Sequence, residues 1–464
     1  MRTFLATLRP RTVLLAAWLV VFLHAYPGQM TTDSFDHHAE AQAGVYSDGH
    51  PPFTSLLWKL VEYVVYGGTG MLILQTATFL AGLYAVLRHT FAPRRAAWIA
   101  SALFLFPPIA VPFAQIWKDC LMAGFLMLGI AGLASRCRWR RLAALAAFAV
   151  ATAVRYNAFA ATFPLVVLLF EWRPGLAWYK RYAIALAAWL AVTLAAFGAN
   201  RAITDRETDI WYASLALYDL AGTLAHLDRD VPDTELAPIL DGTGVLVRDG
   251  IQARAREVFS PRSFLGVISG ERRMWAMPAY GIVELPAAQR DAIGRAWRAI
   301  VADHPGAYVR YRLAVASAVL GLDGKRASGI VIRREDRVET FAYAQHIPLA
   351  SSPLQDHMSA GLASLAKVAP IFAPWMYALL ALVAIALALA TGNCRDVIAY
   401  AASGLAVEAT LVFLASTTDY RYSHWLVVAT ALSLAILVAR RARQPLFLAA
   451  ASTQHSAASQ ASTQ

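Results

Sequence analysis

A short segment near the N-terminus carries an unusual concentration of ionisable side chains. Residues 26–53 contain three Asp, one Glu and three His. Asp33 and His37 are four residues apart, as are Asp36 and Glu40, so on a helix each pair would share one face. A carboxylate in such a segment can act as a general base that takes a proton from a hydroxyl, and Asp33 is the candidate for that role. The candidate substrate-binding residues in the same segment are Asp36, His37 and His50.

This segment could instead bind a divalent cation. Carboxylates and imidazoles at i and i+4 on a helix can hold such an ion, with His50 or Asp48 completing the shell. The HExxH and CxxC patterns that indicate zinc more strongly are absent from the sequence. We therefore expect no required cofactor, and the alternative metal site stays open. Its candidate ligands are Asp33, His37 and His50.

A third interpretation of the segment is purely structural. Thr31 or Thr32 can cap a helix that Gly44 ends. A carboxylate in the first turn, such as Asp33, favours the positive end of the helix dipole. The next two acids, Asp36 and Glu40, could be solvated or capping residues and nothing more.

The rest of the chain is typical of a membrane protein. It has 464 residues, of which 58% are hydrophobic and 15% charged, which is too little charge for a soluble surface. The apolar residues come in long blocks, as in membrane helices. The net charge of +11 comes from short arginine clusters between the blocks, as the positive-inside rule predicts. Nucleic-acid binding would favour a continuous basic face instead.

These blocks predict an all-α polytopic membrane protein with about ten transmembrane helices and both ends in the cytoplasm. Residues 1–200 form an N-terminal transmembrane module that includes a first extracytoplasmic, catalytic loop at 28–70. Part of that loop predicts an amphipathic helix on the outer membrane face. Residues 201–365 have no apolar run long enough to span and predict a mostly helical extracytoplasmic domain. The C-terminal transmembrane helices lie at 366–443, and a disordered cytoplasmic tail at 444–464.

With this topology, the conspicuous polar residues gather at the outer ends of the helices. Ionisable groups at membrane depth are costly and usually line a cavity or mark a site. Lys118, Arg155 and Arg421 could stabilise the charge of a phosphate leaving group, although long cationic side chains also snorkel to lipid headgroups. The neighbouring side chains suited to the hydroxyls or phosphate oxygens of a ligand are Tyr156, Asn157 and Tyr422.

The order of several short motifs resembles that of the GT-C glycosyltransferases, and more narrowly a poorly characterised bacterial subgroup of them. The resemblance covers roughly 1–180 and 365–440. The chain departs from the subgroup at His38 and Glu40, where an aromatic residue and a glutamine are common, so acceptor recognition stays open. The motifs that carry the resemblance are PGQMTTDS at 27–34, HPP at 50–52, WKD at 117–119, RYN at 155–157 and DYRY at 419–422.

The resemblance implies an enzyme that takes a sugar from a polyprenyl-phosphate carrier and passes it to an acceptor on the outer face. In that superfamily a carboxylate of the first outer loop acts near the acceptor hydroxyl, and Asp33 matches it. A base opposite a cationic leaving-group pocket predicts inversion. The implied location is a bacterial inner membrane, with the site facing the periplasm or exterior. The implied partners are membrane lipid, the lipid-linked donor and a glycan, glycolipid or protein acceptor, without nucleic acid.

Other functions are compatible with parts of the sequence. A secondary transporter would predict inverted repeats and charges near mid-membrane, whereas these polar residues cluster at one face. A ligase or polymerase of the lipopolysaccharide pathway would share the topology and the leaving group but transfer a whole glycan. A purely structural membrane protein gives no reason for the one-sided cluster. The sequence has no Walker, Rossmann or GxSxG motif, which favours a lipid-linked donor.

Overall fold

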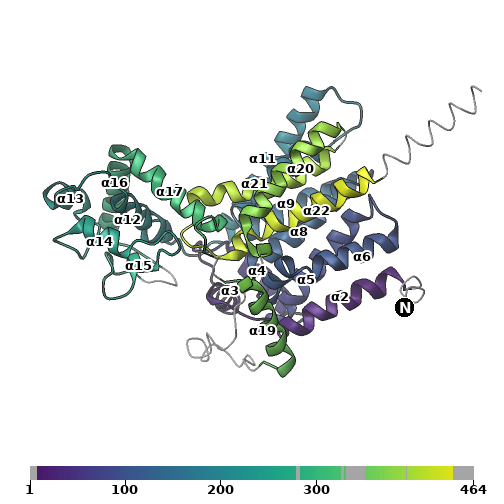
Figure 1. The fold of residues 1–464 in the computed structure, drawn as a ribbon, viewed down its shortest axis with the longest axis horizontal. Helices are drawn as coiled ribbons and strands as arrows, with labels where there is room; N and C mark the ends of the chain where they lie inside the picture. The colour runs from purple at the N-terminus through teal and green to yellow at the C-terminus, as the bar shows by residue number, and fades with distance from the viewer. Residues whose placement is uncertain are drawn as a thin grey trace, which may run out of the picture.

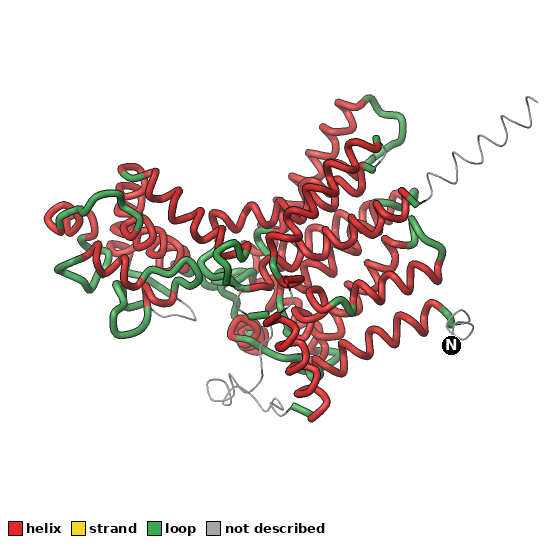
Figure 2. Tube along the Cα trace, in the orientation of Figure 1, coloured by secondary structure: helices red, strands yellow, loops and turns green. Residues whose placement is uncertain are grey.

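The computed structural model describes residues 8–277, 283–325, 329–330, 351–368, 370–392 and 394–442. Within these ranges the chain forms helices and no strand, which confirms the all-α expectation (Figures 1 and 2). The predicted disordered tail at 444–464 lies outside the described residues.

Several helices are apolar and long enough to cross a bilayer, so the chain is a membrane protein. Five pass on length and composition alone. A sixth is added if α6 (Pro93–Phe104) and the following Pro107–Ala114 segment, bent by 70°, count as one broken span. These helices supply five or six of the spans expected from the sequence. The five are α5 (Gly68–Leu87), α11 (Trp178–Ile203), α20 (Pro374–Thr391), α21 (Arg395–Leu414) and the η5–α22 segment (Tyr420–Arg441).

Four shorter helices pack among these. They are α2 (Pro10–Ala25), α8 (Lys118–Leu133), α9 (Arg138–Val154) and α10 (Ala158–Leu169). Of the four, α2 and α10 are apolar. Helix α8 fits closely between α5 and α9 because it carries glycines on its contact faces. A Cβ on Gly124 would collide with Thr78 of α5, and one on Gly132 would meet Ala144 of α9 at 2.8 Å. Small residues of this kind let membrane helices approach closely. The close packing fixes where α8 begins and where α9 ends.

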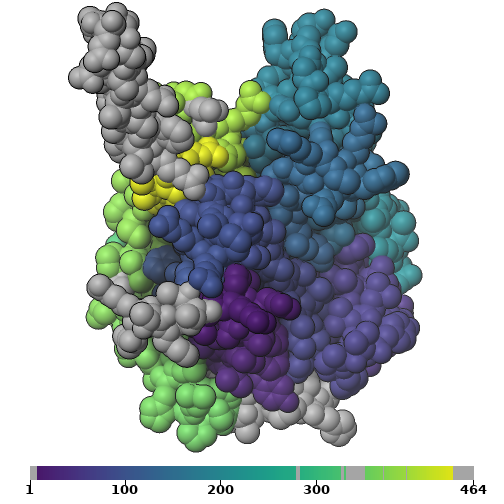
Figure 3. All heavy atoms as spheres, turned by 90° about the vertical axis from the view of Figure 1, so that its right-hand side faces the viewer, coloured from purple at the N-terminus to yellow at the C-terminus, as the bar shows by residue number. Residues whose placement is uncertain are grey.

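The ends of these helices meet on one side of the bundle. Asn200 near the end of α11 donates to the carbonyl of Ala153 in α9, at 2.9 Å, and accepts from the amide of Phe53, at 3.0 Å. The hydroxyl of Tyr420 donates to the carbonyl of Pro108. We call this side the α3 end, after α3 (Thr32–Ala43), which lies there with α4 (Pro52–Glu62). The opposite end of the bundle faces the viewer in Figure 3. The helix ends away from α3 carry arginines, which are Arg88 after α5, Arg138 at the start of α9, Arg395 at the start of α21 and Arg440 at the end of α22.

A second hydrophobic core forms beyond the α3 end, at the left of Figure 1. Asp219 is buried in this core with Arg312, and it accepts hydrogen bonds from Trp297 at 2.6 Å and from Tyr311 and Arg312. Arg312 also donates to the carbonyl of Ala415 at 3.1 Å, which ties this core to the end of α21. Its helices are α12 (Leu217–Ala225), α13 (Asp233–Leu240), α14 (Ile251–Val258), α15 (Leu265–Ile268), α16 (Ala287–Asp303) and α17 (Pro305–Leu320).

Two further segments complete the α3 end. A π-helical turn, η2 (Trp211–Ala216), leads into α12 and brings the second core to the cavity described below. Helix α19 (Pro353–Val368) lies against α2, where Gln355 donates to the carbonyls of Leu23 and Tyr26 at 3.2 and 2.5 Å. The second core, α19 and the membrane helices therefore enclose the α3 end from several sides.

Candidate active site

Helix α3 positions the acidic segment, and its ends are those that the sequence predicts. Thr31 is the N-cap and forms a capping box with Ser34, and Gly44 ends the helix in the left-handed conformation at φ 67°. Ser34 also donates to the carbonyl of Ile116 at 2.6 Å, and Trp117 donates to the Thr31 hydroxyl at 3.0 Å. The first turn of α3 is therefore fixed against the residues that begin α8.

Asp33 lies at the centre of the charged groups. Its Oδ2 is 2.9 Å from the Arg421 guanidinium and 3.4 Å from the Lys118 ammonium. Burial alone would raise the pKa of Asp33, but the charges of Arg421 and Lys118 outweigh it and hold the pKa well below its usual value. Asp33 is thus an ionised carboxylate that holds two cations together.

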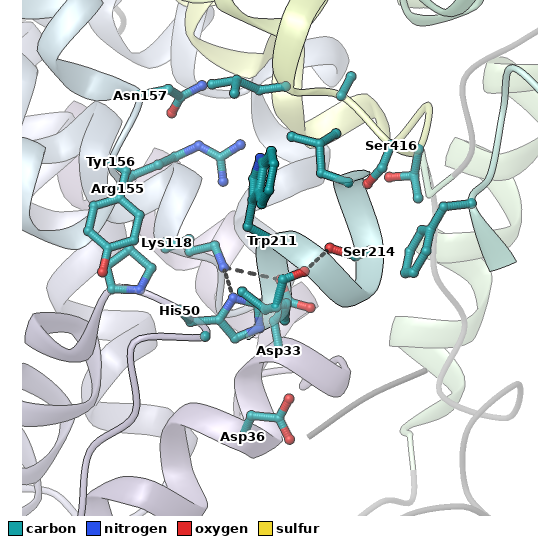
Figure 4. Close-up of a pocket in the computed structure, with 18 of the residues that line it drawn as sticks. Asp33, Asp36, His50, Lys118, Arg155, Tyr156, Asn157, Trp211, Ser214 and Ser416 are labelled. Atoms are coloured by element: carbon teal, nitrogen blue, oxygen red, sulfur yellow. Dashed lines mark hydrogen bonds and ion pairs between the residues drawn. The ribbon is translucent and has the colours of Figure 1, made fainter. Parts of the chain in front are cut away.

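Lys118 also determines the state of His50. The Lys118 ammonium donates to Nδ1 of His50 at 2.9 Å, as Figure 4 shows. Burial and the nearby Lys118 charge lower the pKa of His50 to about 3. His50 is therefore neutral, with its proton on Nε2, because an ammonium can only donate. It can offer one hydrogen-bond donor to a ligand.

His37 stands behind this group in a separate hydrogen-bond chain. The hydroxyl of Ser55 donates to Glu40 at 2.6 Å, so His37 Nδ1 must donate to that hydroxyl at 2.9 Å. Glu40 also accepts from the Ser47 amide at 3.1 Å and hydroxyl at 2.5 Å. Burial, together with the Lys118 charge, keeps the pKa of His37 well below its usual value. His37 does not line the cavity, and these contacts hold α3, α4 and their connecting loop in place.

A second ion pair lies beside the first. Arg155, directly after α9, contacts both carboxylate oxygens of Asp119 in α8, at 3.0 and 3.1 Å. Its guanidinium stands over the ring of Tyr422 at 5.2 Å. Asp119 belongs to the WKD motif, but its pairing with Arg155 was not predicted. The pair means that Arg155 already has its own counter-charge, as Arg421 also has in Asp419 at 3.0 Å.

The two residues after Arg155 differ in their surroundings. The Tyr156 ring stacks on Phe197, with centroids 5.6 Å apart. Burial and the charges of Asp48 and Glu40 raise the pKa of Tyr156 to about 12, so its hydroxyl keeps its proton. Asn157 donates to the hydroxyl of Thr410 at 3.3 Å. Both residues line the cavity and can offer polar groups to a ligand.

One cavity of about 630 Å³ brings most of these side chains together. Figure 4 shows Lys118, His50 and Asp33 in contact, with Asp36 apart from them. Of the residues predicted from sequence to act in catalysis or in binding the donor or substrate, His37 alone does not line the cavity. Those that do are Asp33, Asp36, His50, Lys118, Arg155, Tyr156, Asn157, Arg421 and Tyr422.

Most of the remaining lining comes from segments in which the sequence indicates no functional residue. Trp211 and Ser214 come from the π-helical turn, and a π-helical turn is often found at functional sites. No feature of the sequence separated them from the other aromatic and polar residues of 201–365. The apolar wall that they join consists of Ile210, Leu215, Phe264, Ile268, Val283, Leu411 and Leu414.

The cavity therefore has a charged part and an apolar part. Lys118, Arg155 and Arg421 supply positive charge, and Nη1 of Arg421 is a buried donor without a hydrogen-bond partner among the described residues. Charge-assisted hydrogen bonds from such donors bind phosphate oxygens well. The apolar wall suits a hydrocarbon group, so the cavity fits an anionic ligand that also has an apolar portion.

The alternative of a metal centre fits this geometry less well. Within the described residues, no group of three His, Cys, Asp or Glu side chains is placed to hold a metal ion. The Lys118 ammonium already contacts Asp33 and the Nδ1 lone pair of His50. His37 uses its Nδ1 on Ser55. The Lys118 ammonium therefore occupies the position between Asp33 and His50 at which these candidate ligands would have held a metal ion.

Comparisons with known proteins add no further information on this site. No family model, curated protein or solved structure matches the chain.

Proposed function

We propose that the protein is a membrane glycosyltransferase that moves a sugar from a polyprenyl-phosphate donor to an acceptor hydroxyl. One observation carries this proposal. A single cavity at the ends of membrane helices combines carboxylates on α3 with three cations and an apolar wall. A lipid-linked sugar phosphate has matching parts, because its phosphate needs cations and its chain needs apolar contacts.

The cations are suited to the charge that develops during transfer. When the bond between the anomeric carbon and the phosphate oxygen breaks, its electron pair stays on the phosphate. Asp33 positions Lys118 and Arg421 before that charge develops. Nη1 of Arg421 has no hydrogen-bond partner among the described residues and can donate to the phosphate. Donors fixed in advance in a partly enclosed site stabilise developing charge more than water does. Attack from the carboxylate side, opposite these cations, would invert the anomeric carbon.

The proposal extends to topology and location. We propose that the shorter helices α2, α8, α9 and α10 complete about ten spans, with the arginine clusters in the cytoplasm. The cavity would then open to the periplasm or cell exterior of a bacterial inner membrane. The acceptor would be a cell-envelope glycan, a glycolipid or a protein there, and transfer of a whole glycan would make the protein a ligase or polymerase instead.

The test is a turnover assay on purified protein in nanodiscs. A panel of radiolabelled polyprenyl-phosphate sugars is added, and loss of the label from the lipid is followed over time. Lys118→Gln is compared with Lys180→Gln, the same change at an exposed position at the start of α11, at the opposite end. The proposal expects turnover by the wild type and by Lys180→Gln, and a loss of about 10²-fold or more in Lys118→Gln.

Two outcomes would count against the proposal. Equal turnover in both lysine variants would remove the cationic cavity from the reaction. No turnover with any donor, together with specific uptake of a solute into liposomes that contain the protein, would indicate a transporter.

A further inference from the structure

Two carboxylates of α3 line the same cavity but have different surroundings. Asp33 contacts Arg421 at 2.9 Å and Lys118 at 3.4 Å. Asp36, one turn further along α3, has neither an ion pair nor a hydrogen bond to any other described residue, although it too lines the cavity. A carboxylate between two cations is a weak base, whereas one without a counter-charge is a stronger base.

We propose that Asp36, rather than Asp33, is the catalytic base that takes the proton from the acceptor hydroxyl. Asp33 is then a positioning residue that holds Lys118 and Arg421 where the donor phosphate binds. This inference rests on the proposed glycosyl transfer, and it assigns the acceptor to the part of the cavity beside Asp36. Figure 4 shows Asp36 apart from the cluster of Asp33, Lys118 and His50.

The charges around Asp36 favour a base. Burial and the negative charges of Asp33 and Glu40 raise its pKa to about 6, against a smaller opposing effect of Lys118. At pH 7 such a carboxylate is still mostly ionised, yet it binds a proton more tightly than an ordinary aspartate does. Carboxylates tuned toward neutral pH are common among general bases. Glu40 is a poor alternative because Ser47 and Ser55 already donate to both of its oxygens.

The reaction step balances as follows. The acceptor oxygen forms a bond to the anomeric carbon while its proton passes to an Asp36 oxygen. The bond from the anomeric carbon to the donor phosphate breaks, and the electron pair leaves with the phosphate toward the cations. After the product leaves, Asp36 releases its proton to water, so no oxidant, reductant or further reactant is needed.

The test compares three variants in nanodiscs, with polyprenyl monophosphate as the binding probe and a polyprenyl-phosphate sugar as the turnover probe. Asp36→Asn is expected to lose about 10²- to 10⁴-fold in turnover and to bind polyprenyl monophosphate as the wild type does. Asp36→Ala is expected to regain part of its turnover with added formate, which a merely structural role would not produce. Asp33→Ala is expected to change affinity for the probe and to show no rescue by formate.

Other results would contradict either the role of Asp36 or the proposed function. Full turnover in Asp36→Asn, or formate rescue in the Asp33→Ala variant instead, would overturn the assignment and leave glycosyl transfer intact. A wild-type protein that consumes no donor of the panel would overturn the proposed function itself, and the role of Asp36 with it.

Discussion

The guanidinium of Arg421 lies 2.9 Å from the carboxylate of Asp33, so the turn before α22 contacts α3. The Arg421 side chain is 8% exposed and that of Asp33 is 23% exposed. Removing Arg421 leaves Asp33 with Lys118 alone, and removing Asp33 leaves Arg421 with Asp419 alone, so either change leaves an enclosed charge with less compensation. This contact therefore joins the N-terminal and the C-terminal membrane helices at the cavity.

The first prediction concerns the stability of this pair. Arg421→Gln is expected to lower the free energy of unfolding by about 2–4 kcal/mol, because Asp33 keeps only Lys118 as a close cation. The double variant with Asp33→Asn is expected to recover part of that loss. Thermal unfolding in detergent measures both, and additive losses in the double variant would contradict the coupling. Arg201→Gln, which breaks an exposed pair with Glu207, is the control.

The second prediction concerns pH. The pKa of Asp36 is raised from 3.8 to about 6, so the folded state holds this proton more tightly than the unfolded state does. Its contribution to stability is therefore full below pH 4 and is lost as the pH rises through 6. Relative to the wild type, Asp36→Asn should gain about 1–2 kcal/mol between pH 4 and 7, after allowance for solvent screening of a partly exposed group.

Melting temperatures of the two proteins between pH 4 and 7 measure this difference. A constant difference across the range would contradict the raised pKa. Asp230→Asn, at an exposed position in the second core region, serves as the matched control.

The third prediction concerns the link between the second core and the cavity. Asp219 accepts from side chains of α16 and α17, and Arg312 of the same network donates to Ala415. Asp219→Ala leaves Arg312 buried without its counter-charge and is expected to destabilise the protein by about 3–5 kcal/mol. Limited proteolysis should then cut first within 216–320. Arg310→Ala, which breaks an exposed pair with Asp228, should leave the cleavage pattern unchanged, and equal patterns in all proteins would contradict the prediction.

The fourth prediction concerns metal dependence. Lys118 contacts both Asp33 and His50, two of the three side chains that could otherwise hold a divalent cation. Turnover is therefore expected to be unchanged after EDTA treatment and gel filtration. Loss of turnover that added Mg²⁺, Mn²⁺ or Zn²⁺ restores would instead place Asp33 and its neighbours in a metal site.

Local sequence rules predicted the helix that carries the acids. Thr31 and Gly44 mark the ends of α3 through short-range hydrogen bonding and backbone conformation, which neighbouring residues determine. The gathering of Lys118, Arg155 and Arg421 was also predictable, because alternating spans bring every second loop to the same side. Both inferences needed only the order of residues along the chain.

What the sequence could not supply is the pairing among these groups. Nothing in the spacing of Asp33 and Asp36 says that the first meets two cations and the second none, because those cations come from distant helices. The Asp119–Arg155 pair depends on the packing of α8 against α9. The wall at Trp211 depends on how the second core meets α21. Such contacts follow from tertiary packing and leave no local pattern.

The most direct test of the account is to locate the donor phosphate. A cryo-electron microscopy structure of the protein with polyprenyl monophosphate would do so. The account predicts the phosphate inside the cavity, about 3 Å from the nitrogens of Lys118 or Arg421, with the lipid chain along the apolar wall. A phosphate bound elsewhere, with the cavity filled by water, would contradict the assignment of this cavity as the site of transfer.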